Sequence, residues 1–350
     1  MRRTLFLISI LLVGLLVVGC SSSTDSNNEN NSDNNNNNNS SSNNETEEVV
    51  ELSLGHVVST DDHYHVFAEE LQKQVEEKSD GSMTIDLFPQ GQLGDEGTLF
   101  QQAQSGTLDI LVFGQSAVTN TIKELAVFDL PYLFDSVEQV NEVLSGDIGQ
   151  KYLDLMSDYD IKGLGYLSAA ERNVFSNKPI YELDDFKGLK LRDSEAPSYI
   201  RTFEVLGAQP TPMAYDEVYL SLQQGAIDGA SAPPHVFLAD KFVETSDYYN
   251  LTRAFYLPAM AAMSQKTWDG LTEEQQKIIE EAVAEAIPKS VEHYMDNYED
   301  ALAEIEAEGV EIIETNLEEI QEKVTSIYDE LLEDVPNGDE LLKEIQDAVQ

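Results

Sequence analysis

The segment from Gly188 to Ala232 constrains the fold most, because a short apolar strand is followed there by two helix-plus-strand units in quick succession. Leu189 and Leu191 alternate with two cationic residues, a pattern that is typical of a strand with one buried face. The strand ends at Arg192, and a helix is expected to follow. Arg192 therefore lies where open α/β sheets place their ligands, at the carboxyl end of a strand.

Two helices are predicted after this strand. Ser194 can cap a helix that begins near Pro197 and stops at Gly207. After a proline-containing turn, Asp216 can cap a second helix that ends at Gly225. Strands that alternate with helices in this way predict the α/β class.

Arg192 can hold an anion, since a planar guanidinium matches the two oxygens of a carboxylate. The residues alone leave open that it pairs with an Asp or Glu at the surface. The chain has 66 acidic against 20 basic residues, which gives a formal net charge of −46. Such a charge repels nucleic acids and anionic headgroups, so we expect no nucleic-acid function. It also opposes an anionic ligand, so an arginine would have to act at close range.

The N-terminus has the pattern of a secretory signal peptide. Two arginines precede an apolar run from Leu5 to Val18, which is too short to be a convincing membrane span. We therefore predict a signal peptide over residues 1–19. The residues that end at Cys20 resemble a bacterial lipobox, in which the cysteine is lipidated and becomes the mature N-terminus.

Cys20 is the only cysteine in the chain, so neither a disulfide within the chain nor a cysteine metal cluster can form. Residues 21–48 are almost all Ser, Asn, Asp, Glu and Thr, which cannot bury enough apolar surface to fold. We interpret residues 20–48 as a lipidated cysteine and a disordered tether. About 28 flexible residues reach roughly 30 Å, enough to lift a domain off a membrane.

Strands and helices also alternate in the first part of the folded chain. Residues 49–54, the alternating segment 83–87 and the apolar segment 108–113 are predicted strands. Helices are expected over residues 62–78 and, after a cap at Asp95, as far as Gly106. This order predicts an α/β lobe.

His63 and His65 flank Tyr64 near the start of the first predicted helix. An H-x-H pair suggests a metal site, but the sequence shows no third ligand. We therefore expect ordinary loop and cap positions and no metal.

Gly163 and Gly165 open a G-x-G pattern, but Ser168 stands where a dinucleotide-binding turn needs its third glycine. We expect no cofactor. Residues 163–167 are instead predicted to form a strand that leads to Arg172.

A single long helix is predicted from Thr272 to about Glu308. Thr272 and Gln275 form the pattern of a capping box, and Pro288 lies near the middle. About 37 residues would span about 55 Å, the width of two small lobes. The tail over residues 316–350 is expected to form acidic helices with one apolar stripe.

Several motifs together resemble the solute-binding proteins of tripartite ATP-independent periplasmic (TRAP) transporters, of the dicarboxylate-binding DctP type. The resemblance covers essentially everything from residue 50 to about residue 310. The matching motifs are GLKLR at 188–192, LGAQPTPMAYDEVYLSLQQGAIDG at 206–229, LGHV at 54–57, FPQGQLGDE at 88–96, SGTLDI at 105–110, AVFDLPYLF at 126–134, ERNVFSNKPI at 171–180 and SQKTWDGLTEEQQKII at 264–279.

The resemblance implies a two-lobed α/β fold of the periplasmic-binding-protein (Venus flytrap) kind, with a long helix that spans both lobes. Lobe I would comprise residues 49–169 and 258–297, and lobe II residues 170–257 and 298–350. It implies a protein without enzymatic activity. The signal peptide and the lipobox-like residues that end at Cys20 imply a lipid anchor at the outer face of the cytoplasmic membrane. There it would capture a small organic carboxylate by hinge closure and deliver it to membrane permease subunits.

The resemblance also implies a ligand site between the lobes. Arg192 would take the carboxylate as a bidentate pair, and Arg172 would add a second positive contact. Tyr215 would form a wall of the cleft.

Three further residues, Glu96, Gln115 and Ala232, would shape the other end of the cleft. Two of them depart from patterns in the family. Ala232 replaces an asparagine that commonly contacts the ligand, which puts transfer of any particular ligand in doubt. Gln115 stands where some sialic-acid-binding members place a glutamate, which argues mildly against that substrate.

Two other function classes remain open. A ligand-reading sensor subunit would share the fold and the cleft but would associate with a receptor. A secreted hydrolase could use paired carboxylates, yet the chain has no GxSxG or HExxH motif and no acid pair stands out.

Overall fold

The computed structural model describes residues 49–349. The predicted signal peptide, Cys20 and the tether lie outside these residues. Among the helices of the described part, none combines the length and the apolar character that crossing a bilayer requires.

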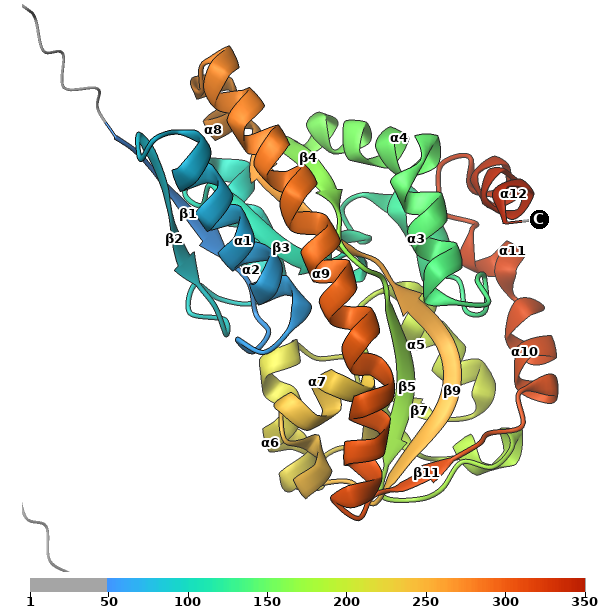
Figure 1. The fold of residues 1–350 in the computed structure, drawn as a ribbon. Helices are drawn as coiled ribbons and strands as arrows, with labels where there is room; N and C mark the ends of the chain where they lie inside the picture. Colours follow the sequence, from blue (N-terminus) through green and yellow to red (C-terminus); the bar gives the residue numbers. More distant parts are fainter. Residues whose placement is uncertain (1–48, 350) are drawn as a thin grey trace, which may run out of the picture. The chain divides into compact units, whose positions relative to one another are not determined.

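A five-stranded sheet with the order β2-β1-β3-β10-β4 forms the centre of the first lobe (Figure 1). Strand β1 runs parallel to β2 and β3, whereas β10 lies antiparallel between β3 and β4. The strands are β1 (Val50–Gly55), β2 (Met83–Phe88), β3 (Ile110–Gly114), β4 (Ile161–Tyr166) and β10 (Ala259–Ser264). The helices of this part are α1 (His63–Lys78), α2 (Glu96–Ser105), α3 (Val137–Ser145), α4 (Asp147–Leu155) and α8 (Gln265–Gly270).

A six-stranded sheet with the order β11-β9-β5-β8-β6-β7 forms the centre of the second lobe. Its strands are β5 (Ala170–Ser176), β6 (Lys190–Arg192), β7 (Gln209–Pro210), β8 (Gly229–Ala232), β9 (Tyr248–Leu257) and β11 (Glu311–Ile313). The helices of this part include α5 (Pro197–Leu206), α6 (Val218–Gln223) and α7 (Pro234–Ala239). The predicted two-lobed α/β fold is confirmed.

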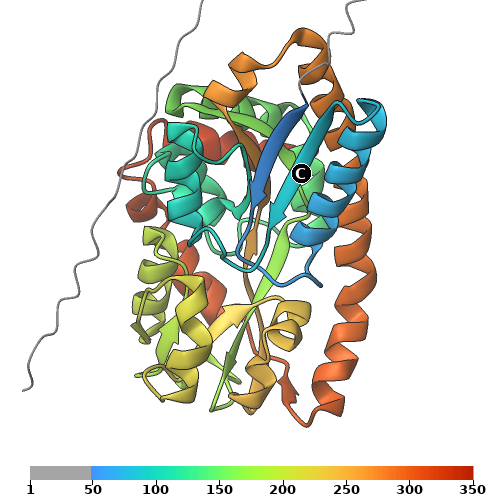
Figure 2. The ribbon, with the colours of Figure 1, turned by 90° about the vertical axis from the view of Figure 1, so that its left-hand side faces the viewer.

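The chain passes from one sheet to the other between β4 and β5, between β9 and β10, and along helix α9 (Glu273–Ala307). Helix α9 packs against α1 of the first lobe and α7 of the second. In Figure 2 it runs along the side of both lobes, so the predicted helix spanning both lobes is present. Three C-terminal helices follow it: α10 (Glu318–Thr325), α11 (Tyr328–Leu331) and α12 (Gly338–Ala348).

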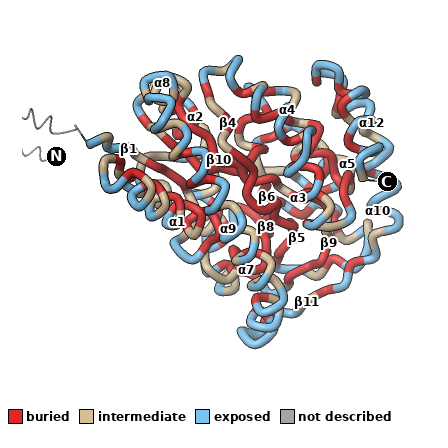
Figure 3. Tube along the Cα trace, turned by 45° about the horizontal axis from the view of Figure 1, so that its top comes forward, coloured by how far each residue is buried: buried red, intermediate tan, exposed pale blue. Residues whose placement is uncertain are grey.

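Strand β3 shows how the first sheet is buried on both faces. Ile110 and Val112 pack in a hydrophobic cluster with residues of α1 and α9, whereas Leu111 and Phe113 pack with residues of α2, α3 and α4. The alternation follows from the two-residue period of a strand. Figure 3 shows the buried strands running through the interior, while the outward faces of the helices are exposed.

Two of the predicted helix caps are wrong. The N-cap of α5 is Ala196, and Ser194 Oγ instead accepts a hydrogen bond from the Ala196 N–H at 3.3 Å, within the turn that precedes the helix. Pro197 at the first helical position lacks an N–H, so fewer donors need a cap. Asp216 lies inside a 3₁₀ turn over Tyr215–Glu217, where its charge still favours the helix N-terminus.

The capping box of α9 is confirmed, and it allows a stability prediction. Thr272 Oγ1 accepts from the Gln275 N–H at 3.3 Å, and Gln275 Oε1 accepts from the Thr272 N–H at 2.9 Å. We expect Thr272→Ala to lower the free energy of unfolding by about 1 kcal/mol, because the helix loses a capping acceptor. Urea denaturation measures this change. Thr272→Ser keeps the acceptor and should match the parent, and an equal loss in both variants would show that the cap is not the cause.

Candidate functional site

Two adjoining cavities lie between the lobes. One has a volume of about 370 Å³ and the other of about 70 Å³. In the first lobe they share residues from the loop after β1 and from the start of α2. In the second lobe they share residues from the end of β6, from the loop after it and from the turn before α6. The shared residues are Val57, Glu96, Arg192, Ser194 and Tyr215.

Arg192 is the last residue of β6, and its side chain lines both cavities although the residue is only 5% exposed. Its Nε and Nη2 donate to the Met213 carbonyl at 3.1 and 2.8 Å. Within residues 49–349, the arginine ion pairs involve Arg172, Arg201 and Arg253 but not Arg192. Burial lowers the pKa of the Arg192 guanidinium, since desolvation disfavours its charge. An anion in the cavity would offset this desolvation.

Arg172 comes from β5 and lines the smaller cavity, but its charge already has a partner. Its Nη2 lies 3.1 Å from Asp193 Oδ1, and its Nε donates to Ser231 Oγ at 2.9 Å. Burial lowers the pKa of Arg172, but the Asp193 carboxylate and nearby tyrosines outweigh burial and raise it. The charge of Arg172 is therefore neutralised within the chain by a buried salt bridge.

Glu96 places an acidic group opposite Arg192. It is the first residue of α2, and its Oε1 accepts from the Gly114 N–H at 2.8 Å. Burial raises its pKa, whereas the hydrogen bond from Gly114 and the charge of Arg192 act against that rise. Glu96 thus offers carboxylate oxygens to the same space into which Arg192 presents N–H donors.

Tyr215 forms a wall of both cavities, and its ring centroid lies 5.8 Å from Arg192 Cζ. Its hydroxyl donates a hydrogen bond to the carboxylate of Asp240. This bond fixes the ring and leaves its face toward the guanidinium. The arrangement is typical of a cation–π contact.

Asp240 gives stability a pH dependence. Burial raises its pKa to about 6, so between pH 3.8 and that value the folded chain binds more protons than the unfolded chain. Stability is therefore lost as the pH rises through about 6. We expect Asp240→Asn, which keeps an oxygen for Tyr215, to be about 2 kcal/mol more stable than the parent at pH 7, after allowance for partial exposure. The two should be equally stable near pH 4 in urea denaturation, and a gain that is the same at both pH values would contradict this.

Gln115 and Ala232 are not among the residues that line either cavity. Gln115 is fully buried, with Nε2 donating to the Leu125 carbonyl at 2.9 Å and Oε1 accepting from the Tyr166 hydroxyl at 3.3 Å. Ala232 is 1% exposed and packs in the apolar core of the second lobe. The structure brings Arg192, Arg172, Tyr215 and Glu96 together and leaves these two apart.

Sequence reasoning missed several residues of the smaller cavity, among them Asp62, Tyr64, Ser116 and Ser194. Asp62 had been assigned only to the start of a helix. A usable signal existed, because the loop after β1 and the loop after β3 leave the same carboxyl edge of parallel strands. Residues in those two loops were therefore candidates for the site.

The chain is similar to known solute-binding proteins over most of its length. Residues 54–334 match the family described as bacterial extracellular solute-binding protein, family 7. An uncharacterised protein of Haemophilus influenzae is 31% identical over 303 residues, which make up 85% of this chain and 90% of that protein.

Two solved structures share the fold. A sugar acid binding protein from Advenella mimigardefordensis, in complex with galactonate, has 28% identity and a TM-score of 0.84, and the match covers 86% of this chain and 98% of that one. A TRAP periplasmic solute binding protein from Polaromonas sp. JS666, bound to D-erythronate, has 28% identity and a TM-score of 0.82, with 85% and 98% covered.

Proposed function

Because this chain belongs to family 7 of the bacterial extracellular solute-binding proteins, we propose that it captures a small organic carboxylate outside the cytoplasm and delivers it to TRAP membrane permease subunits. The observation that carries this proposal is Arg192, a guanidinium that is buried, lines a cavity and pairs with no carboxylate in the described chain. A buried charge without a partner is costly, so its presence favours an anionic ligand as the partner.

We infer that the ligand is a hydroxylated acid. Arg192 supplies donors for a carboxylate, whereas Glu96 supplies acceptor oxygens that suit the hydroxyl groups of the same molecule. The larger cavity, of about 370 Å³, has room for such a polar chain beyond the carboxylate. The structural relatives bound to galactonate and D-erythronate support this class, since both ligands are sugar acids.

We propose that the ligand site closes by hinge motion between lobes with boundaries near residues 169/170 and 257/258. Two of the three chain crossings between the sheets, from β4 to β5 and from β9 to β10, fall at these positions. The C-terminal helix α12 would belong to the first lobe, rather than to lobe II as the sequence suggested. Its Leu341 and Ile345 pack in the same hydrophobic cluster as Tyr152 of α4.

We propose that Cys20 is lipidated and that residues 20–48 tether the binding domain to the outer face of the cytoplasmic membrane. The sequence around Cys20 and the polar composition of the tether support this. A tether of that length would keep the domain within roughly 30 Å of the membrane in which the permease lies.

A matched ligand pair tests the proposed function. Isothermal titration calorimetry of the purified chain should show binding of galactonate or another sugar acid and no binding of galactitol, which has the same carbon skeleton without the carboxylate. Mass spectrometry should recover the bound acid unchanged, as expected of a protein without catalytic activity. Equal binding of galactitol, or no binding by any acid in a panel of aldonates and uronates, would reject the proposal.

A further inference from the structure

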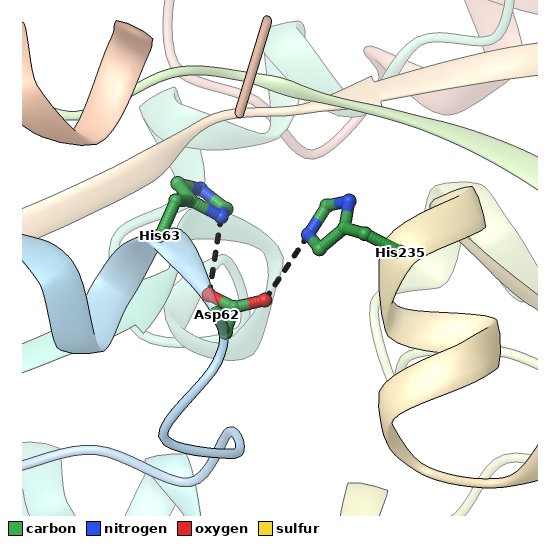
Figure 4. Close-up of side chains that lie close together, drawn as sticks. All are labelled: Asp62, His63 and His235. Atoms are coloured by element: carbon green, nitrogen blue, oxygen red, sulfur yellow. Dashed lines mark hydrogen bonds and ion pairs between the residues drawn. The ribbon is translucent and has the colours of Figure 1, made fainter. Parts of the chain in front are cut away.

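Asp62, His63 and His235 form a cluster that the capture of a carboxylate does not explain (Figure 4). Asp62 caps α1, and His63 is the first residue of that helix, in the first lobe. His235 is the second residue of α7, in the second lobe. One ligand atom from each residue lies within 4.8 Å of the other two.

The cluster is buried, and several of its ring nitrogens lack hydrogen-bond partners. Asp62 and His63 are each 2% exposed, and the His235 side chain is 11% exposed. Both ring nitrogens of His63 and the Nδ1 of His235 have no hydrogen bond within the described structure. Buried polar atoms in folded proteins nearly always have a partner, so these nitrogens are available to bind a further group.

The contacts to Asp62 do not complete the cluster. Its Oδ2 lies 3.2 Å from His235 Nε2, and its Oδ1 lies 3.1 Å from His63 Nδ1. However, Oδ1 also accepts the Tyr64 N–H at 2.9 Å as the helix cap, and the contact with His63 lacks hydrogen-bond geometry. Figure 4 shows both imidazole rings turned toward this one carboxylate.

We propose that Asp62, His63 and His235 bind a divalent transition metal, with Zn²⁺ as the cation that fits this donor set. Two imidazoles and one carboxylate are ligands that zinc takes at about 2.0–2.2 Å, and three protein ligands leave a fourth position open. The rings and the carboxylate need only a small inward movement to reach such distances. His65, the other half of the H-x-H pair, is engaged elsewhere, since its Nδ1 lies 2.9 Å from His56 Nε2.

Two of the three proposed ligands, Asp62 and His63, line the smaller cavity together with Glu96 and Arg192, so we infer that the open position is reached from this cavity. An oxygen of a bound acid, or a water molecule, would fill that position. This part of the inference rests on the proposed function, whereas metal binding by itself does not. Because its ligands come from both lobes, the metal would also favour the closed arrangement of the lobes.

Metal binding is testable with Zn²⁺ alone. The purified full chain, stripped of metal with a chelator, is titrated with Zn²⁺ by calorimetry in about 1 M salt, which screens weak binding to the acidic surface. We expect one equivalent to bind. Asp62→Asn and His235→Gln should each weaken binding by at least about 100-fold, because even residues that merely support a ligand cost about 10- to 100-fold.

His293→Gln is the matched control, since His293 lies near the cluster but contacts the Asp61 carbonyl. It should bind Zn²⁺ like the parent. Asn is a good helix cap, so the melting temperature of Asp62→Asn without metal should stay near that of the parent. If His235→Gln folds poorly, the zinc affinity of Asp62→Asn alone still tests the inference. The inference is overturned if no stoichiometric Zn²⁺ binds, if Asp62→Asn binds normally, or if His293→Gln loses as much affinity. Zinc binding without acid binding would support the metal site and reject the proposed function. Acid binding without zinc binding would support the proposed function and reject the metal site.

Discussion

Replacing Arg192 with alanine is expected to weaken acid binding by roughly 100- to 4,000-fold. The ligand's carboxylate would then lie in a buried site without its cation, and the loss of one partner of a buried pair costs about 3–5 kcal/mol, with 1.4 kcal/mol for each tenfold. The fold should survive, because within residues 49–349 the Arg192 side chain forms no ion pair and is held by the Met213 carbonyl and the Tyr215 ring. Calorimetry with the acid that binds the parent measures the affinity, and urea denaturation measures the stability.

Two further variants sharpen this test. Arg192→Lys keeps the charge but lacks the planar fork, so its affinity should fall between those of the parent and Arg192→Ala. Arg201→Ala removes an arginine that pairs with Glu330 at the surface and should bind the acid normally. Unchanged affinity in Arg192→Ala would show that Arg192 does not bind the carboxylate, and Arg172 would then be the next candidate.

Replacing Arg172 with alanine is expected to lower the free energy of unfolding by about 3–5 kcal/mol, because Asp193 would be left as a buried carboxylate without its cation. Asp193 is 3% exposed, and its remaining side-chain partner is the Ser231 hydroxyl. Urea denaturation of Arg172→Ala beside the parent measures this loss. The effect on acid binding should be smaller than that of Arg192→Ala.

A double variant distinguishes the effect of the ion pair on stability from other effects of losing the Arg172 side chain. Arg172→Ala combined with Asp193→Ala removes both charges and should recover part of the stability lost in the single variant. A loss below about 1 kcal/mol in Arg172→Ala would show that the pair contributes little, as many exposed pairs do. An affinity loss equal to that of Arg192→Ala would show that Arg172 contacts the ligand.

Local signals in the sequence were sufficient for much of the fold. The helix ends marked by Asp95 and Thr272, each a side chain that caps the next few residues, lie where they were predicted. Such caps depend on neighbours three residues away, so they can be recognised before any tertiary contact is known. The place of Arg192 at the end of a strand followed from an equally local pattern, the alternation of Leu189 and Leu191 with cationic residues.

Partners distant in sequence could not be predicted. Whether Arg172 faces a ligand or Asp193 depends on how β5 pairs with β8 and on the loop after β6, which no local pattern specifies. The same applies to Asp62 and His235, whose contact joins residues 173 positions apart. Gln115 is a further case, because its neighbour Ser116 lines the smaller cavity whereas its own amide donates to the buried Leu125 carbonyl.

The position of β10 within the first sheet has a consequence for the order in which the chain can fold. This strand, Ala259–Ser264, lies between β3 and β4, although about a hundred residues that build the other sheet precede it in the chain. A polypeptide that emerges from the ribosome or from a secretion channel N-terminus first cannot complete the first sheet until residue 264 has appeared. Until then β3 and β4 lack the strand that pairs with both of them, so the core of the first lobe is incomplete while the second sheet is already emerging.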